Sequence, residues 1–461
     1  MNNKKNKTNF FYTLFFFTFT IFDALSFSLI RDAQTEKFLR DLCSPIFNAA
    51  GINPEEVKIY IVNDNSINAF VSQGRNIFIN TGLIRKFDNP DALIGVVAHE
   101  VGHIVGGHVA RSSEEINKAS NTILLSYLLG AGAILAGSPE AGQGIIMGGS
   151  NAAEKLYLKY SRSQEEAADK YALQYLDKIN YPAEGLIKLL EFFDSQNRGY
   201  EDYLDEYAQS HPVSRKRIDY LKFNYKLKNN NNEIGKKLLK EMSDVLSKLE
   251  GFIDNPNIVI EKYKNSNSEN AKYSKAIALH RIGNSKEAKK LISEIIFNNK
   301  NDGFLYELKA QIEFESGDIN NSILSYKQAI KNLNSRDSSQ SKIYMASAII
   351  LVANKDKDLL EIALANLKQA KEYEKENPFL FKQLSVVYNK MNDEARSMAA
   401  LAEYNFLLGD LKKSKKYANK AKEKFDEFDN KNLFKQDKIS LDDLIYEINL
   451  QENADKNNKK N

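Results

Sequence analysis

The feature that most constrains this chain is the pentapeptide His99-Glu100-Val101-Gly102-His103, which lies inside the apolar stretch 92–104. In an α-helix, residues four positions apart lie one turn apart on the same face. Both imidazoles can therefore reach one metal ion, and the carboxylate of Glu100 lies beside them. This pattern predicts a zinc site in which Glu100 takes a proton from a metal-bound water.

The residues around this motif predict a short, buried helix. Asn89 and Pro90 are typical of a helix start, and Gly106-Gly107 is typical of a helix end. Between them, apolar residues recur at steps of three and four, which indicates a buried stripe. The alternative is an amphipathic helix without a metal, but two histidines and a carboxylate buried without partners would be unfavourable there.

The length and the charge of the chain limit how many domains it can form and which partners it can bind. Its 461 residues suffice for two or three domains. Lys and Arg number 64 against 61 Asp and Glu, so the net charge is +3, and the two signs are interleaved. This balance predicts no nucleic-acid partner. The lone Cys43 cannot form a disulfide within the chain and is expected to be buried.

The N-terminus has the three parts of a secretory signal peptide over residues 1–26. Three lysines precede the apolar run 10–22, and small residues follow at Ala24 and Ser26. The run is short for a membrane-spanning helix. We therefore expect export across the inner membrane to the periplasm, with an uncleaved inner-membrane anchor as the alternative.

The order of elements predicts an α+β fold that is mostly α. Helical spacing over 35–50 is followed by strand alternation over 57–62 and again over 76–80, with a turn at Gly74. The metal-binding helix comes next. A strand exposed beside that helix would allow a peptide to bind in extended form by backbone pairing.

A glycine-containing apolar segment follows at 122–149, interrupted at Pro139. Neither of its arms has the roughly twenty apolar residues that a transmembrane hairpin needs. Two interpretations stay open. The segment is either a buried helical hairpin, or a functional loop that acts as a mobile apolar lid over the cleft or makes peripheral contact with a membrane.

The C-terminal half has helical periodicity with regularly spaced turns. The interval from Gly283 to Gly317 is 34 residues, the period of tetratricopeptide repeats, and further turns are expected at 354–356 and Gly409. We predict four or so helical pairs stacked in a solenoid that binds peptides or proteins. An ordinary helical bundle is the alternative.

These patterns give a division of the chain into five parts. The predicted parts are a signal peptide (1–26), a metallopeptidase domain (27–225), a helical linker (226–268), repeats (269–425) and a C-terminal helix with a polar tail (426–461). The polar residues from Glu452 onward predict disorder.

A catalytic zinc site needs a third protein ligand and an open position. The segment 160–169 has helical character and places Glu165 and Asp169 four residues apart on one face. Glu165 is the expected third ligand, and Asp169 is expected to accept the free ring N–H of a ligand histidine. Glu166 is the alternative ligand, and a solvated acidic patch is the alternative interpretation of the whole segment.

Together these motifs resemble those of the M48 peptidase family over roughly residues 30–225. The resemblance rests on His99-Glu100-x-x-His103 and Ser161-Arg162-x-x-Glu165-x-x-x-Asp169, and more weakly on Asn68-Ala69-Phe70, Thr81-Gly82-Leu83 and Ser210-His211-Pro212 with Arg217-Ile218. It implies a zincin-like domain that holds one Zn²⁺ per chain, with Glu165 as the third ligand. A signal peptide before this domain and repeats after it resemble the periplasmic members of the family.

His211 and Arg217 are candidates for a supporting catalytic role. Either side chain could stabilise the oxyanion that forms during peptide hydrolysis. His211 could also occupy the open metal position and make the resting enzyme self-inhibited, or it could simply cap a helix. By contrast, His108 is expected to lie at the helix end, away from the ligand face, and His280 is expected to be structural.

From these features we predict a zinc endopeptidase that degrades or processes misfolded or misassembled envelope (outer-membrane) proteins. The repeats are expected to bind these substrates or the outer-membrane assembly machinery. The alternative is an envelope chaperone or assembly adaptor whose zinc site is latent or structural, and a third interpretation is a processing peptidase with one dedicated substrate. The presence of Glu100 favours catalysis, because a structural site would not need it.

Overall fold

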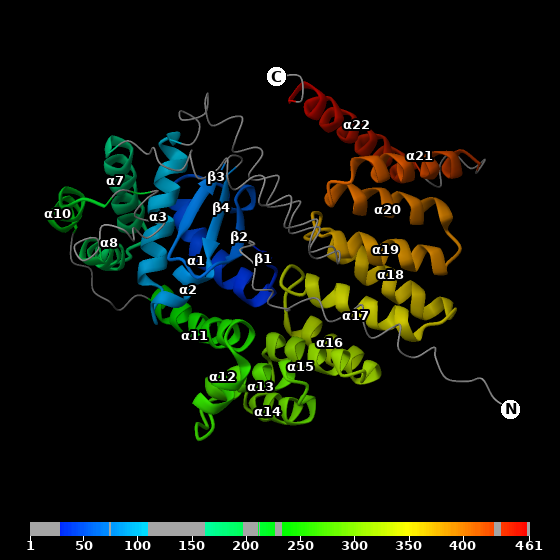
Figure 1. The fold of residues 1–461 in the computed structure, drawn as a ribbon, viewed down its shortest axis with the longest axis horizontal. Coiled ribbons are helices and arrows are strands. Elements are labelled where there is room, and N and C mark those ends of the chain that lie inside the picture. Colours follow the sequence, from blue (N-terminus) through cyan, green and yellow to red (C-terminus); the bar gives the residue numbers. More distant parts are fainter. Residues whose placement is uncertain are drawn as a thin grey trace. The chain divides into compact units, whose positions relative to one another are not determined.

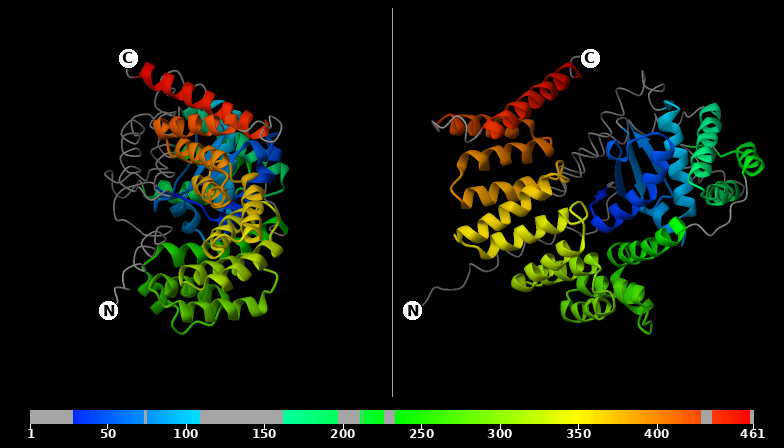
Figure 2. Two further views of the ribbon diagram at one scale, coloured as in Figure 1. Left: turned by 90° about the vertical axis from the view of Figure 1, so that its right-hand side faces the viewer. Right: turned by 180° about the vertical axis from the view of Figure 1, so that it is seen from behind.

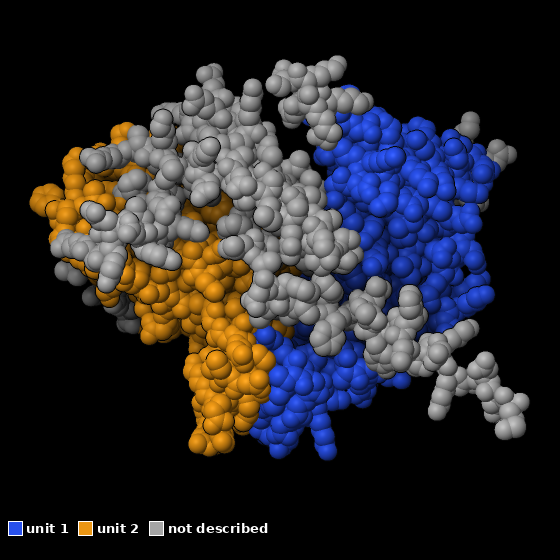
Figure 3. Space-filling model, viewed as in Figure 1, with its two compact units in different colours: residues 1–22, 129–142, 276–461 blue, residues 23–128, 143–275 orange. Residues whose placement is uncertain are grey.

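The computed structural model describes residues 28–72, 75–108, 162–196, 211, 213–225, 233–427 and 435–458. The chain divides within helix α13 (Glu269–Arg281) into two compact units (Figure 3), unit 2 up to Lys275 and unit 1 from Ala276 onward. The predicted signal peptide and the apolar segment 122–149 lie outside the described residues. The interpretations given for these two segments therefore stay predictions.

Unit 2 contains a four-stranded mixed sheet with the strand order β1-β2-β4-β3 (Figure 1). The central pair is parallel and each outer strand is antiparallel to its neighbour; the strands are β1 (Ser28–Ile30), β2 (Lys58–Asn63), β3 (Ala69–Ser72) and β4 (Asn76–Asn80). Strands β2 and β4 confirm the two expected strands. All five residues of β4 are buried, which suits its position inside the sheet.

The predicted motif helix is α3 (Asp91–Val105), which packs against the sheet edge at β3 and against three helices. Every residue from Ala92 to His103 is buried. The helix ends at Gly106, as the sequence predicts, and Gly107 has a left-handed φ of 64° that turns the chain. The other helices up to this point of the chain are α1 (Ala33–Ala49), the short η2 (Pro54–Glu56) and α2 (Thr81–Lys86).

Helix α7 (Arg162–Lys178) lies very close to α3 because Gly102 has no side chain. A Cβ atom at Gly102 would lie 2.7 Å from the backbone oxygen of Ala168 on α7. Helix α8 (Glu184–Gln196) approaches α3 in a similar way at Gly95, where a Cβ would lie 2.7 Å from Leu186 Cβ. The two glycines of α3 therefore set how closely the neighbouring helices pack.

Three more helices complete the part of unit 2 before α13: α10 (Arg215–Asn224), α11 (Glu233–Ile253) and α12 (Pro256–Lys262). Helices α11 and α12 lie within the region 226–268 that the sequence analysis expected to be a linker. Its main helix, α11, contributes apolar side chains to the same core as α1 and the sheet; they are Leu238, Met242, Val245 and Leu249. An ion pair of 2.8 Å between Lys37 and Glu241 also joins α1 to α11.

Unit 1 is a succession of helices that, from α14 onward, pack on their neighbours in chain order, seen from two sides in Figure 2. They are the end of α13, α14 (Ser285–Asn298), α15 (Gly303–Glu315), α16 (Ile319–Asn332), α17 (Ser339–Val352), α18 (Lys357–Lys371), α19 (Pro378–Lys390), α20 (Glu394–Leu407), α21 (Leu411–Glu427) and α22 (Lys435–Asn458). This arrangement is the expected mostly helical, solenoid-like architecture. That the pairs are tetratricopeptide repeats stays a prediction.

The predicted turns of unit 1 are confirmed by their backbone conformation. Gly283, Gly317, Asn354 and Gly409 all have positive φ, between 46° and 84°, and Asn392 marks a further turn that the sequence analysis did not identify. The expected disorder from Glu452 is wrong up to Asn458, because α22 continues to that residue. An ion pair of 2.6 Å with Lys415 holds Glu452 against α21.

The described helices include none that combines the length and apolarity needed to cross a bilayer.

We expect Gly102→Ala to destabilise unit 2, because the added Cβ would collide with the backbone of α7. Overpacking of this kind costs about 1–3 kcal/mol in the free energy of unfolding, which chemical denaturation measures. Gly235→Ala in α11 is the matched control, since its Cβ would be 3.6 Å from the nearest atom, Tyr181 Oη. An unfolding free energy for Gly102→Ala equal to that of the wild type would contradict the close packing.

Candidate metal centre

Helix α3 places the two motif histidines one turn apart and points both side chains to the same side. Their Nε2 atoms are 3.1 Å apart, and both rings are fully buried. An imidazole binds a metal through one nitrogen while the other carries the proton. The two Nε2 atoms therefore form the expected pair of metal ligands.

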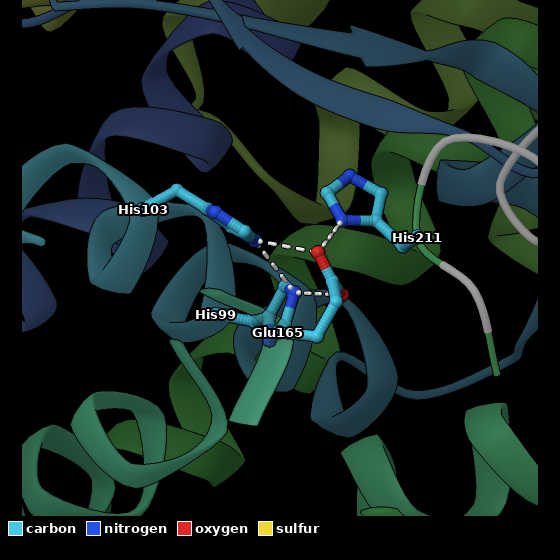
Figure 4. A group of neighbouring side chains, drawn as sticks. All are labelled: His99, His103, Glu165 and His211. Carbon is cyan, nitrogen blue, oxygen red and sulfur yellow. Dashed lines mark hydrogen bonds and ion pairs between the residues drawn. The ribbon is translucent and has the colours of Figure 1, made fainter. Parts of the chain in front are cut away.

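Glu165 of α7 lies where the sequence predicts the third ligand. Its Oε2 lies 3.3 Å from His99 Nε2, and its Oε1 lies 3.3 Å from His103 Nε2 (Figure 4). A tetrahedral ion with ligands about 2.0–2.1 Å away keeps those ligands about 3.3 Å apart, so the three donors fit such an ion. The alternative ligand Glu166 is partly exposed, and its carboxylate contacts Lys216 at 2.8 Å instead.

His211, which precedes α10, completes a group of four whose ligand atoms all lie within 4.8 Å of one another. Its Nδ1 is 3.3 Å from Glu165 Oε1 (Figure 4), and its Nε2 is 3.3 Å from Glu100 Oε1. The helix cap of α10 is Ser214, whose side chain accepts from the backbone N–H of Arg217. His211 is therefore not the cap, and it lies where the sequence analysis expected a residue able to occupy the fourth position.

Asp169 and Arg217 form a buried layer behind the ligands. Asp169 Oδ1 is 2.9 Å from His99 Nδ1, the position expected for a group that orients a ligand histidine. Arg217 binds Asp169 through Nε and Nη2 at 2.8 and 2.9 Å, and its Nη1 lies 2.8 Å from Glu165 Oε2. These contacts favour a role for Arg217 in holding both carboxylates.

His108 is a neighbour of the site that the sequence analysis did not assign to it. The residue is buried, and its Nδ1 lies 3.0 Å from Nδ1 of His103. The signal that could have revealed it is the Gly106-Gly107 pair, because a left-handed turn after a helix reverses the chain toward the last helical turn.

Glu100 is fully buried beside the ligand group. His211 Nε2 is 3.3 Å from Oε1, but neither carboxylate oxygen accepts a hydrogen bond from a residue that the structure describes. Burial raises the pKa of Glu100. Among the residues described, the Glu100 carboxylate therefore has free acceptor oxygens beside the three candidate metal ligands. This is the arrangement expected of a residue that receives a proton from a metal-bound water.

The two ligand histidines differ in their affinity for protons. Burial opposes a charged His99 ring, but the hydrogen bonds and charges of Asp169 and Glu165 outweigh it and raise the pKa of His99 to about 9. For His103, burial dominates and lowers the pKa to about 3. Burial alone would raise the pKa of Glu165, yet the surrounding histidines hold it well below its usual range.

Asp169 is likewise kept ionised despite its burial. Desolvation raises its pKa, but the charge of Arg217 and the hydrogen bonds with His99 and Arg217 lower it below the ordinary value. The site therefore holds three buried carboxylates, those of Glu100, Glu165 and Asp169, and the guanidinium of Arg217. The converging imidazole and carboxylate donors, rather than the net charge, are what could bind a divalent cation.

Comparison with known families supports this interpretation: residues 33–223 match the model of peptidase family M48. The matched region contains the whole ligand group, and it begins at the first residue of α1 and ends inside α10.

Several curated proteins are similar to part of this chain. The beta-barrel assembly-enhancing protease of Escherichia coli (strain K12) is 26% identical over 192 residues, which are 41% of this chain and 39% of that protein. The mitochondrial metalloendopeptidase OMA1 of Saccharomyces cerevisiae is 31% identical over 172 residues, 35% of this chain and 45% of that protein. The metalloprotease YcaL of Escherichia coli (strain K12) is 28% identical over 193 residues, which are 42% of this chain and 70% of that protein. The chain thus matches about two fifths of the bacterial assembly-enhancing relative.

We expect Glu165→Gln to lose its metal and the neighbouring Glu166→Gln to keep it. Only Glu165 lies between the two ligand histidines, and a neutral amide is a much poorer metal ligand than a carboxylate. Metal content per chain after dialysis, measured by mass spectrometry, separates the two variants. Loss of metal in Glu166→Gln with retention in Glu165→Gln would reverse the assignment.

Metal binding should release about one proton per chain near pH 7, because metal binding requires deprotonated ligands. His99, with a pKa of about 9, must lose its proton, whereas His103, with a pKa of about 3, has none to lose. Calorimetry in buffers of different ionisation enthalpy counts the protons. The release should vanish as the pH rises above 9 and should shrink in Asp169→Asn, and a release that does not change with pH would contradict the assignment.

Proposed function

Because residues 33–223 form a domain of peptidase family M48, we propose that this chain is a zinc-dependent endopeptidase that acts on unfolded or misassembled envelope proteins. The three ligand residues support zinc, since two imidazoles and one carboxylate are its typical catalytic ligand set. His99, His103 and Glu165 would hold the ion. When bound there, zinc would supply a Lewis acid that lowers the pKa of a coordinated water.

The observation that carries this proposal is the burial of the Glu100 carboxylate without a hydrogen bond from the described residues. A side chain that served only packing would not keep a carboxylate fully buried with both oxygens lacking a hydrogen bond from the described residues. Burial also raises its pKa, which moves a carboxylate toward the range where it both accepts and donates protons near neutral pH.

In the reaction, Glu100 would accept a proton from the attacking water at a carboxylate oxygen. It would then return that proton to the amine nitrogen of the leaving peptide. His211 would donate a hydrogen bond to the developing oxyanion, because its ring lies beside Glu100 Oε1 and within the ligand group. Arg217 is the less suitable oxyanion donor, since its three guanidinium nitrogens contact Glu165 and Asp169.

The sheet supports a way of holding an extended peptide. Strand β3 lies at the end of the strand order, and among the described strands it pairs only with β4. It also packs against α3, the helix that carries His99 and His103. Backbone pairing along the outer edge of β3 would bind a peptide without regard to its side chains, which suits unfolded substrates.

The cellular role proposed here rests on similarity and on domain composition. One group of relatives is named for enhancing beta-barrel assembly, and the match covers less than half of those proteins. The helices of unit 1 would bind substrate or the outer-membrane assembly machinery, as helical solenoids bind extended partners. The predicted signal peptide favours the periplasm as the location.

The rival proposal is an assembly adaptor whose zinc site is latent. It is favoured by the burial of every ligand and by the position of His211, which fills the fourth place of the ligand group. A processing peptidase with one dedicated substrate is a third proposal, and a comparison of envelope proteomes with and without the gene would distinguish it.

We expect Glu100→Gln to abolish cleavage of an unfolded protein such as reduced casein while metal content and thermal stability stay unchanged. General acid–base catalysis contributes about 10²–10⁴-fold, so kcat should fall by at least about 100-fold. The wild type and the variant are compared at equal zinc occupancy. Retention of most of the activity in Glu100→Gln would contradict the proposed role.

A second comparison separates catalysis from the adaptor role. If zinc-loaded wild type and His211→Ala both fail to cleave any unfolded substrate, the adaptor proposal is favoured. Cleavage by His211→Ala alone would identify a self-inhibited peptidase, and cleavage by the wild type would show that His211 does not block the site.

A further inference from the structure

The two ligand histidines have different neighbours at their second ring nitrogens. His99 Nδ1 faces the carboxylate of Asp169 at 2.9 Å, an arrangement expected beside metal-bound histidines. His103 Nδ1 faces another imidazole, that of His108, at 3.0 Å. We propose that His108 is a positioning residue that fixes the tautomer and the ring orientation of His103, an inference that rests on the proposed zinc site.

The argument begins with the nitrogen that His103 presents to the metal position. Its Nε2 is 3.1 Å from His99 Nε2 and 3.3 Å from Glu165 Oε1, so the ligand atom is Nε2. A neutral imidazole that donates its Nε2 lone pair carries its proton on Nδ1. His103 Nδ1–H must then donate a hydrogen bond, and His108 Nδ1 is 3.0 Å away to accept it.

The geometry of the two rings fits a hydrogen bond between their Nδ1 atoms, and the tautomer of His103 sets its direction. Their planes meet at 75° with the ring centroids 5.0 Å apart, so one ring edge faces the other. His108 is buried, and water therefore competes little for the hydrogen bond. A neutral acceptor holds the ring without adding a fourth carboxylate to a site that already contains three, those of Glu100, Glu165 and Asp169.

The chain turn that precedes His108 is shaped to admit its ring. Gly107 has a φ of 64°, which favours glycine and turns the chain after α3. At Gly106 a Cβ atom would lie 2.5 Å from His108 Nε2, so any other residue would collide with the imidazole. Both glycines thus serve to place His108 against His103 as well as to end the helix.

The test compares zinc affinity in the full chain for three variants. His108→Phe keeps a ring of similar size but removes the acceptor, and His108→Asn keeps an acceptor oxygen near the position of Nδ1. Loss of such a supporting hydrogen bond weakens metal binding by about 10–100-fold, which we expect for His108→Phe. His108→Asn should recover most of that loss, and Gly106→Ala, which displaces the ring, should resemble His108→Phe.

Affinity is measured by competition with a chelator, and the visible spectrum of the Co²⁺-loaded proteins reports the geometry of the ligands. Thermal unfolding of the metal-free proteins is the control for folding, and it should be nearly the same in wild type and His108→Asn. If His108→Phe binds zinc as tightly as the wild type, or if His108→Asn binds as weakly as His108→Phe, the proposal is wrong. A wild type that binds zinc but cleaves nothing would overturn the proposed function and leave this inference standing.

Discussion

The ion pairs of Arg217 are the interaction on which the rest of the site depends. Glu165 and Asp169 are buried carboxylates, and such charges are stable only when they are paired and hydrogen-bonded. Arg217 neutralises both of them from α10 and so ties α10 to α7. Because His211 lies just before α10, the same ion pairs also place its ring beside Glu100 and Glu165.

The group of candidate metal ligands could be predicted largely because its parts are local patterns. The four-residue spacing of His99 and His103 and of Glu165 and Asp169 determines which face of a helix each pair occupies, whatever the helix packs against. The contacts between helices were harder to predict from the sequence. Arg217 was expected to face the reacting atoms, and its contacts with Asp169, 48 residues earlier, follow from the docking of α10 on α7.

The same distinction explains the differences in the fold. Strands β2 and β4 alternate clearly and were predicted, whereas β1 has only three residues and exists through its pairing with β2. The last part of α22 was expected to be disordered, because its sequence is polar. Tertiary contacts stabilise α22, among them the packing of the buried Ile448 and the ion pair between Lys415 and Glu452. No local sequence pattern predicts such contacts.

The position of α11 has a consequence for how the peptidase part of this chain can be isolated. Four apolar side chains of α11 lie in the core that α1 and the sheet share, and Tyr273 at α13 donates a hydrogen bond of 2.9 Å to Gln34 of α1. A fragment cut at residue 223, where the family match ends, would leave that apolar surface facing water and would tend to aggregate. The compact unit that contains the candidate ligands therefore extends about fifty residues beyond residue 223, and a fragment that keeps this core intact should end no earlier than Lys275.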